Sequence, residues 1–129
     1  MATLSKPSLS INHDHNKKVG KVVVTGKITF TEFEMNQIKE GLKFKLKCAL
    51  WGDDSGLTGA DDHLYTLSSK YLPDASPSAV ENYKFEVTLG EGVLDEDWGT
   101  DEVYAKVKLV NLYTLVAITK NSNIVAHSF

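Results

Sequence analysis

Apolar and polar residues alternate along four segments of the chain. In the first segment, Val22, Val24, Gly26, Ile28 and Phe30 fall on the same side of an extended backbone. The same period of two recurs at Leu42, Phe44, Leu46, Cys48 and Leu50, at Phe85, Val87 and Leu89, and at Val103, Ala105, Val107 and Leu109. Because successive side chains of a strand point to opposite faces, each segment predicts a strand with one buried side. Gly26 indicates a bulge or a close approach of another chain segment.

Weaker patterns complete the predicted set of about eight strands. They cover residues 9–12, 63–67, 113–119 and 124–129, with a turn at 120–123 joining the last two. Residues 34–41 are expected to hold a helical turn, and residues 68–79, which contain Pro73 and Pro77, an irregular crossing segment. No long helix is expected.

Many short strands, each with one apolar face, predict either two sheets packed face to face or a small barrel, and we favour the two sheets. We therefore expect an all-β protein: a two-sheet antiparallel β-sandwich formed by residues 1–129 as a single domain. Residues 22–30 and 42–50 resemble strands B and C of an immunoglobulin-like domain, and Asp101-Glu102-Val103-Tyr104 resembles the start of strand F. This resemblance implies a Greek-key connection. The cysteine pair of that family is absent, and Tyr104 is one position out of register with its tyrosine corner.

Composition and net charge limit the classes of function that this protein can have. Of the 129 residues, 42% are hydrophobic and 24% charged, and the formal net charge is −3. This balance favours a soluble globular protein and gives no positive field for nucleic acid. Lys43, Lys45 and Lys47 alternate with apolar residues and are expected to form a solvated strand face. Cys48 is the only cysteine and is expected to be buried. A reduced, cytoplasmic setting fits, and no segment is apolar and long enough to span a membrane.

Two segments share the pattern Trp-Gly-x-Asp, at Trp51 and at Trp98, and each lies beside further acidic residues. In a Greek-key sandwich the loops at 52–62 and 90–101 emerge at the same end, and the connection near His13 and His15 joins them there. The candidate metal ligands are Asp53, Asp54, Asp61, Asp62, Asp95 and Asp97. Calcium takes six to eight oxygen ligands and is the cation such loops suit. The alternative interpretation is a solvated acidic rim, because Asp and Gly are ordinary turn residues.

His13 and His15 have a spacing that places both on one side of a strand, where they can bind zinc or copper. The sequence shows no third ligand nearby, and we expect this segment to be a mobile chain end instead.

These observations favour a non-catalytic protein-interaction or structural module, acting on another protein or by self-association. The alternative is a carbohydrate-binding module, with Ca²⁺ assistance, in which Trp51 and Trp98 stack on sugar rings. Against it stands the interpretation that the two large indoles close the end of the sandwich core. No phosphate loop, nucleophile elbow or metalloprotease motif is present, so we do not expect an enzyme.

Overall fold

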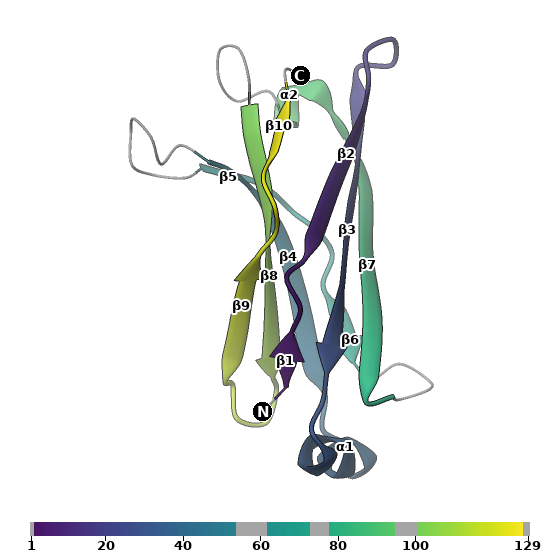
Figure 1. The fold of residues 1–129 in the computed structure, drawn as a ribbon, viewed down its shortest axis with the longest axis vertical. Helices are drawn as coiled ribbons and strands as arrows, with labels where there is room; N and C mark the ends of the chain where they lie inside the picture. The colour runs from purple at the N-terminus through teal and green to yellow at the C-terminus, as the bar shows by residue number, and fades with distance from the viewer. Residues whose placement is uncertain (1, 54–61, 73–77, 95–100, 128–129) are drawn as a thin grey trace.

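The protein is a sandwich of two antiparallel β-sheets, seen in a computed structural model that describes residues 2–53, 62–72, 78–94 and 101–127 (Figure 1). The first sheet contains β1 (Thr3–Leu4), β2 (Ser8–Asp14), β3 (Val19–Thr29) and β7 (Val80–Gly90). The second contains β4 (Phe44–Gly52), β5 (Asp62–Thr66), β6 (Lys70–Leu72), β8 (Asp101–Asn111), β9 (Ala117–Asn121) and β10 (Val125–His127). Two short helices complete the fold, α1 (Glu32–Lys39) and α2 (Glu91–Leu94). The predicted all-β sandwich is confirmed.

Each sheet is organised around long central strands. In the first sheet β3 pairs with β7 on one side and with β1 and β2 on the other. In the second sheet β4 and β8 pair along their length. The free side of β4 carries β5 and β6, and the free side of β8 carries β9 and β10.

The core lies between the inner faces of the two sheets, and it contains the residues that the alternating pattern placed there. Val22, Val24 and Ile28 of β3 are completely buried. The inner positions of β4 and β8 are buried to a similar degree, and those of β7 are buried except for Val87, which is half-buried. Cys48 is buried, as predicted.

Two local predictions need correction. The strand predicted at 113–119 and the turn predicted at 120–123 are shifted: residues 112–114 form a turn, β9 covers 117–121, and β9 and β10 both pair antiparallel with the same strand, β8. Between β9 and β10, Ser122 forms two hydrogen bonds with Ala105 of β8. The Ser122 backbone N–H donates to the Ala105 carbonyl, and the Ser122 hydroxyl accepts from the Ala105 N–H. Within the segment predicted to be irregular, residues 70–72 form β6.

The helical turn expected at residues 34–41 is α1, which begins two residues earlier than expected. Thr31 caps its N-terminus: the Thr31 hydroxyl accepts from the Glu34 N–H at 3.2 Å, and the Glu34 carboxylate accepts from the Thr31 N–H at 2.9 Å. This reciprocal capping box satisfies two backbone donors that the first helical turn leaves open. The Glu34 carboxylate also accepts from the Ala2 N–H, which ties the start of the chain to α1.

The two ends of the sandwich differ. Helix α2 and the β2–β3 turn lie at one end, and α1 and the β8–β9 turn lie at the other (Figure 1). Neither helix in the described part of the chain has the length and apolar character that a membrane span requires.

Candidate functional site

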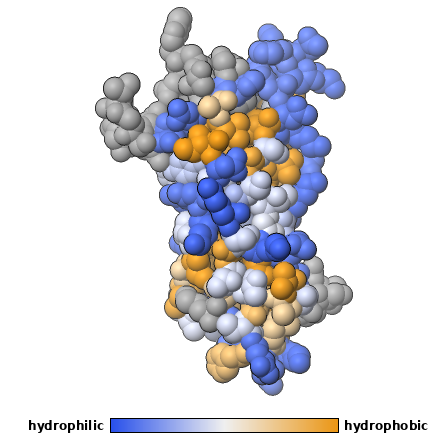
Figure 2. All heavy atoms as spheres, in the orientation of Figure 1, coloured by the Kyte–Doolittle hydropathy of each residue, from blue (hydrophilic) through white to orange (hydrophobic). Residues whose placement is uncertain are grey.

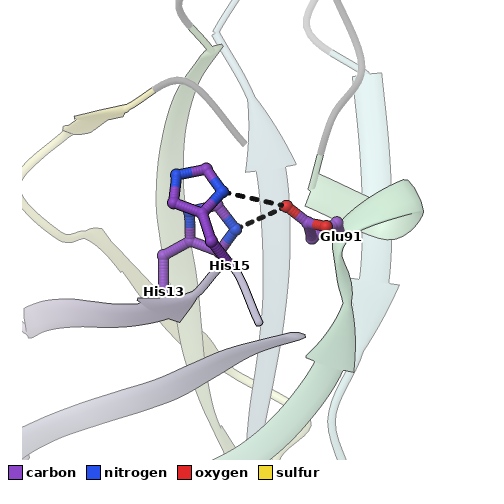
Figure 3. Close-up of side chains that lie close together, drawn as sticks. All are labelled: His13, His15 and Glu91. Carbon is purple, nitrogen blue, oxygen red and sulfur yellow. Dashed lines mark hydrogen bonds and ion pairs between the residues drawn. The ribbon is translucent and has the colours of Figure 1, made fainter. Parts of the chain in front are cut away.

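A cluster of histidine and glutamate side chains occupies the α2 end of the sandwich (Figure 3). His13 belongs to β2 and has the same parity as Leu9 and Ile11, so it continues the inward-facing row of that strand. Its side chain is only 4% exposed. His13 thus lies in a strand that pairs with β3, and His15 lies in the turn that follows this strand.

Both ring nitrogens of His13 have partners. Its Nε2 lies 2.6 Å from a carboxylate oxygen of Glu91, and its Nδ1 lies 2.9 Å from Nε2 of His127. His15 Nδ1 lies 3.9 Å from the same oxygen of Glu91, and the His15 side chain is 76% exposed. The two imidazole rings of His13 and His15 lie side by side, with centroids 4.1 Å apart. One carboxylate thus faces two imidazoles.

The register of the first sheet brings these residues together. His13 pairs across β2 and β3 with Gly20, and Val19 pairs across β3 and β7 with Gly90, the residue before Glu91. The Glu91 N–H also donates to the Lys18 carbonyl at 3.0 Å, which fixes the start of α2 against the β2–β3 turn. The predicted meeting of the 13–15 connection with the segment that begins at residue 90 is therefore observed for His13, His15 and Glu91.

Most of the acidic ligands that the sequence suggested cannot be placed. Asp54, Asp61, Asp95 and Asp97 lie outside the described residues, as does Trp98. The Asp53 N–H donates to the Glu102 carbonyl at 2.8 Å, and Asp62 begins β5 opposite Gly52. Calcium binding by these loops stays a prediction.

Trp51 lies on the outer face of the second sheet and is half-buried. The Lys106 ammonium lies over one face of the indole, 4.7 Å from the ring centroid. The His63 ring packs edge-on against the indole, with the two ring centroids 5.3 Å apart. A sugar that stacks on the face near Lys106 would have to displace a cation–π contact. Binding of a sugar by Trp51 stays a prediction.

The opposite end of the sandwich carries a surface that the sequence did not reveal. A pocket of about 510 Å³ opens between α1, β8 and the turn after β8. Its apolar lining consists of Ala2, Phe33, Phe44, Leu109, Val116 and Ile118. Polar groups of Thr31, Glu34, Gln37, Asn111 and Thr114 complete it. This mixture of apolar walls and a few polar groups is typical of binding pockets.

Exposed apolar side chains gather around this pocket. The described residues include eight large hydrophobic side chains that are exposed, and five of them belong to α1 or to the turn 112–116: Phe33, Leu112, Tyr113, Leu115 and Val116. Phe33 is 70% and Leu115 is 72% exposed. Figure 2 shows apolar surface on the part of the molecule where Figure 1 places α1. We call the pocket together with residues 112–116 the apolar end.

The turn that presents Leu115 is held in one conformation by hydrogen bonds. The Asn111 side-chain oxygen accepts from the N–H groups of Tyr113 and Thr114, and the Asn111 carbonyl accepts from the Leu115 N–H at 2.7 Å. Leu115 has a φ of 63°, in the left-handed region that leucine rarely adopts. An ordered turn therefore keeps a leucine in an unfavourable conformation and exposes its side chain to water.

The sequence does not predict the apolar end, because the pattern at Tyr113, Leu115 and Val116 predicts part of a strand. The sequence signal is the run of four apolar residues at 115–118, followed by the polar run 119–123, because a strand with one buried face would alternate apolar and polar residues. No protein-family model matches this chain, and no curated protein matches its sequence.

Proposed function

We propose that the protein is a non-catalytic protein-interaction module and that its apolar end binds an apolar segment of another protein. The observation that carries this proposal is the combination of the 510 Å³ pocket, whose lining includes the exposed Phe33, with the exposed Leu115 of the turn that contributes Thr114 and Val116 to the same lining. Exposed apolar side chains that gather beside a pocket are a feature of interaction sites in proteins that otherwise keep such residues inside.

The extent of the surface favours a protein segment over a small molecule. A small ligand would fill the pocket and leave Leu115 and Tyr113, which are not part of its lining, in water. A protein segment would insert an apolar side chain into the pocket and cover the turn with its flanking residues, as anchor residues do at interfaces.

Backbone strain at Leu115 supports the same conclusion. A non-glycine residue in the left-handed region costs on the order of 1–2 kcal/mol, and such costs concentrate at binding sites. The strained turn is already ordered by Asn111, so little conformational entropy would be lost when a partner binds.

The immunoglobulin-like Greek key is part of the proposal. The chain passes from the first sheet to the second after β3, returns after β6, and crosses again after β7. Crossings of this kind support a Greek-key arrangement, and such sandwiches commonly serve as binding modules.

A displayed library of random peptides tests the proposal. We expect selection against the wild-type protein to enrich peptides that share a bulky apolar residue. Binding should be lost in Phe33→Asp and weakened about tenfold or more in Leu115→Asn, which keeps a residue that tolerates positive φ but removes the apolar side chain.

Ile124→Asn is the matched control, because Ile124 is also exposed but lies outside the apolar end. Peptides that bind this variant as tightly as the wild type support the proposal. No enriched peptide, or equal loss of binding in Ile124→Asn, would overturn it. A wild-type dimer in light scattering that Leu115→Asn dissociates would assign the apolar end to a second copy of the chain and overturn the proposed partner.

A further inference from the structure

The cluster at the α2 end has the composition of a transition-metal site. The ligand atoms of His13, His15 and Glu91 all lie within 4.8 Å of one another. In a tetrahedral site with zinc–ligand distances near 2.1 Å, ligand atoms are about 3.4 Å apart. The 2.6 Å separation of His13 and Glu91 would open slightly, and the more distant His15 would move inward.

Two properties of the cluster make this adjustment easy. His15 is in the β2–β3 turn and is 76% exposed, so its side chain can rotate toward the carboxylate without disturbing the core. Glu91 and His13 are already in contact and need no ordering. The exposed His15 side chain and the two side chains already in contact can therefore close around an ion.

We propose that His13, His15 and Glu91 bind a zinc ion through His13 Nε2, His15 Nδ1 and a Glu91 carboxylate oxygen. Imidazole and carboxylate ligands suit zinc and neighbouring divalent transition metals, whereas calcium requires a set of oxygen ligands. Three protein ligands leave one coordination position for water.

His127 is the positioning residue of this site. When His13 Nε2 binds the metal, its Nδ1 carries the proton and donates it to Nε2 of His127, 2.9 Å away. Hydrogen bonds of this type fix the ring orientation of metal-bound histidines, and their loss typically weakens metal binding by about 10- to 100-fold. The residues of the site thus come from β2, the β2–β3 turn, α2 and β10.

Isothermal titration of the chelator-treated chain, prepared without a histidine tag, with zinc sulfate tests the proposal. We expect one ion per chain. His15→Ala and Glu91→Gln should each weaken binding by about 100-fold or more, because removal of a ligand costs more than removal of its orienting partner. His63→Ala is the matched control, because His63 is exposed and is hydrogen-bonded to Thr66. Excess calcium should not displace zinc.

Two variants of His127 separate a positioning role from a ligand role. His127→Ala should weaken zinc binding by about 10- to 100-fold, and His127→Gln should retain most of the affinity because an amide oxygen accepts the His13 proton. Equal losses in both variants would overturn the positioning role.

Imidazole proton signals in nuclear magnetic resonance spectra provide a second measurement if a variant is unstable. Zinc should shift the signals of His13 and His15 in the wild-type protein and leave that of His63 unchanged. Failure of the wild type to bind zinc, or binding that His15→Ala leaves intact, would overturn the proposal. Neither result bears on the apolar end, which lies at the other end of the sandwich.

Discussion

Gly26 and Tyr83 are opposite one another in neighbouring strands, and the absence of a side chain at Gly26 is what makes room for the tyrosine. A Cβ atom at position 26 would overlap both the hydroxyl and the ring of Tyr83. The sequence predicted a bulge or a close approach at Gly26, and the structure shows a close approach by the Tyr83 side chain.

Gly26→Ala should therefore lower the free energy of unfolding by about 1–3 kcal/mol, the usual cost of overfilling a packed position. Urea denaturation measures this change in the free energy of unfolding. Gly92→Ala is the control, because a Cβ atom at Gly92 would meet nothing within 4 Å. Equal stability of Gly26→Ala and the wild type would contradict the packing described.

The thiol of Cys48 and the phenol of Tyr83 are weakly acidic groups that are buried in the core. Burial raises the pKa of Cys48 from 9.0 to about 12. Burial, together with the nearby Cys48, raises the pKa of Tyr83 from 10.0 to about 12. Each group therefore keeps its proton in the folded chain at pH values where the unfolded chain has lost it.

The resulting stability is fully present below pH 9.0 and is lost as the pH rises toward 12. For Cys48 alone the free energy of unfolding should fall by up to about 1.4 kcal/mol per pH unit in that interval. Denaturation at a series of alkaline pH values measures the slope. In Cys48→Ala the free energy of unfolding should begin to fall only above pH 10.0, where Tyr83 titrates in the unfolded chain. A pH profile like that of the wild type would show that Cys48 is not the cause of the fall between pH 9.0 and 10.0.

Among the elements, α1 depends most clearly on a single local motif. The sequence Thr31-Glu32-Phe33-Glu34 matches a capping box, and both of its hydrogen bonds are formed. Thr31→Ala should lower the free energy of unfolding by about 1 kcal/mol, the typical cost of losing an N-cap side chain. Thr31→Ser keeps a hydroxyl and should remain near the wild type in the same denaturation experiment. Similar losses in both variants would show that the cap is not the cause.

The central strands could be predicted from the sequence because burial of one face imposes a period of two. Leu42 to Leu50 follow this period without interruption and Val22 to Phe30 follow it except at Gly26, and the structure buries the expected side. The division between β9 and β10 could not be predicted in the same way. It depends on the Ser122 hydroxyl accepting from the Ala105 N–H, a contact between residues that are distant in the sequence.

The histidine cluster was predictable only in part. The spacing of His13 and His15 predicted a metal site, but the third residue of the cluster, Glu91, is 78 residues away from His13 and is brought to it by two strand pairings. Local spacing carries no information about such a partner. The apolar end was not predicted, because its pocket forms only where α1, β8 and the β8–β9 turn meet.

At the scale of the whole molecule, the sandwich separates two chemically different ends. The α2 end gathers imidazole and carboxylate groups, and the other end gathers exposed apolar side chains around a pocket. The paired strands β4 and β8 run along the second sheet between them. We therefore expect a ligand at one end to leave the contacts of the other end unchanged.

Methyl-labelled nuclear magnetic resonance spectroscopy, with a peptide selected on the wild-type protein, tests the role of the apolar end most directly. We predict that the peptide shifts the methyl signals of Leu109, Leu115, Val116 and Ile118 and leaves those of Val22 and Val24, in the first sheet, unchanged. Shifts that spread over both sheets, or that centre on Val93 beside the histidine cluster, would contradict the proposal that this protein binds its partner through the apolar end.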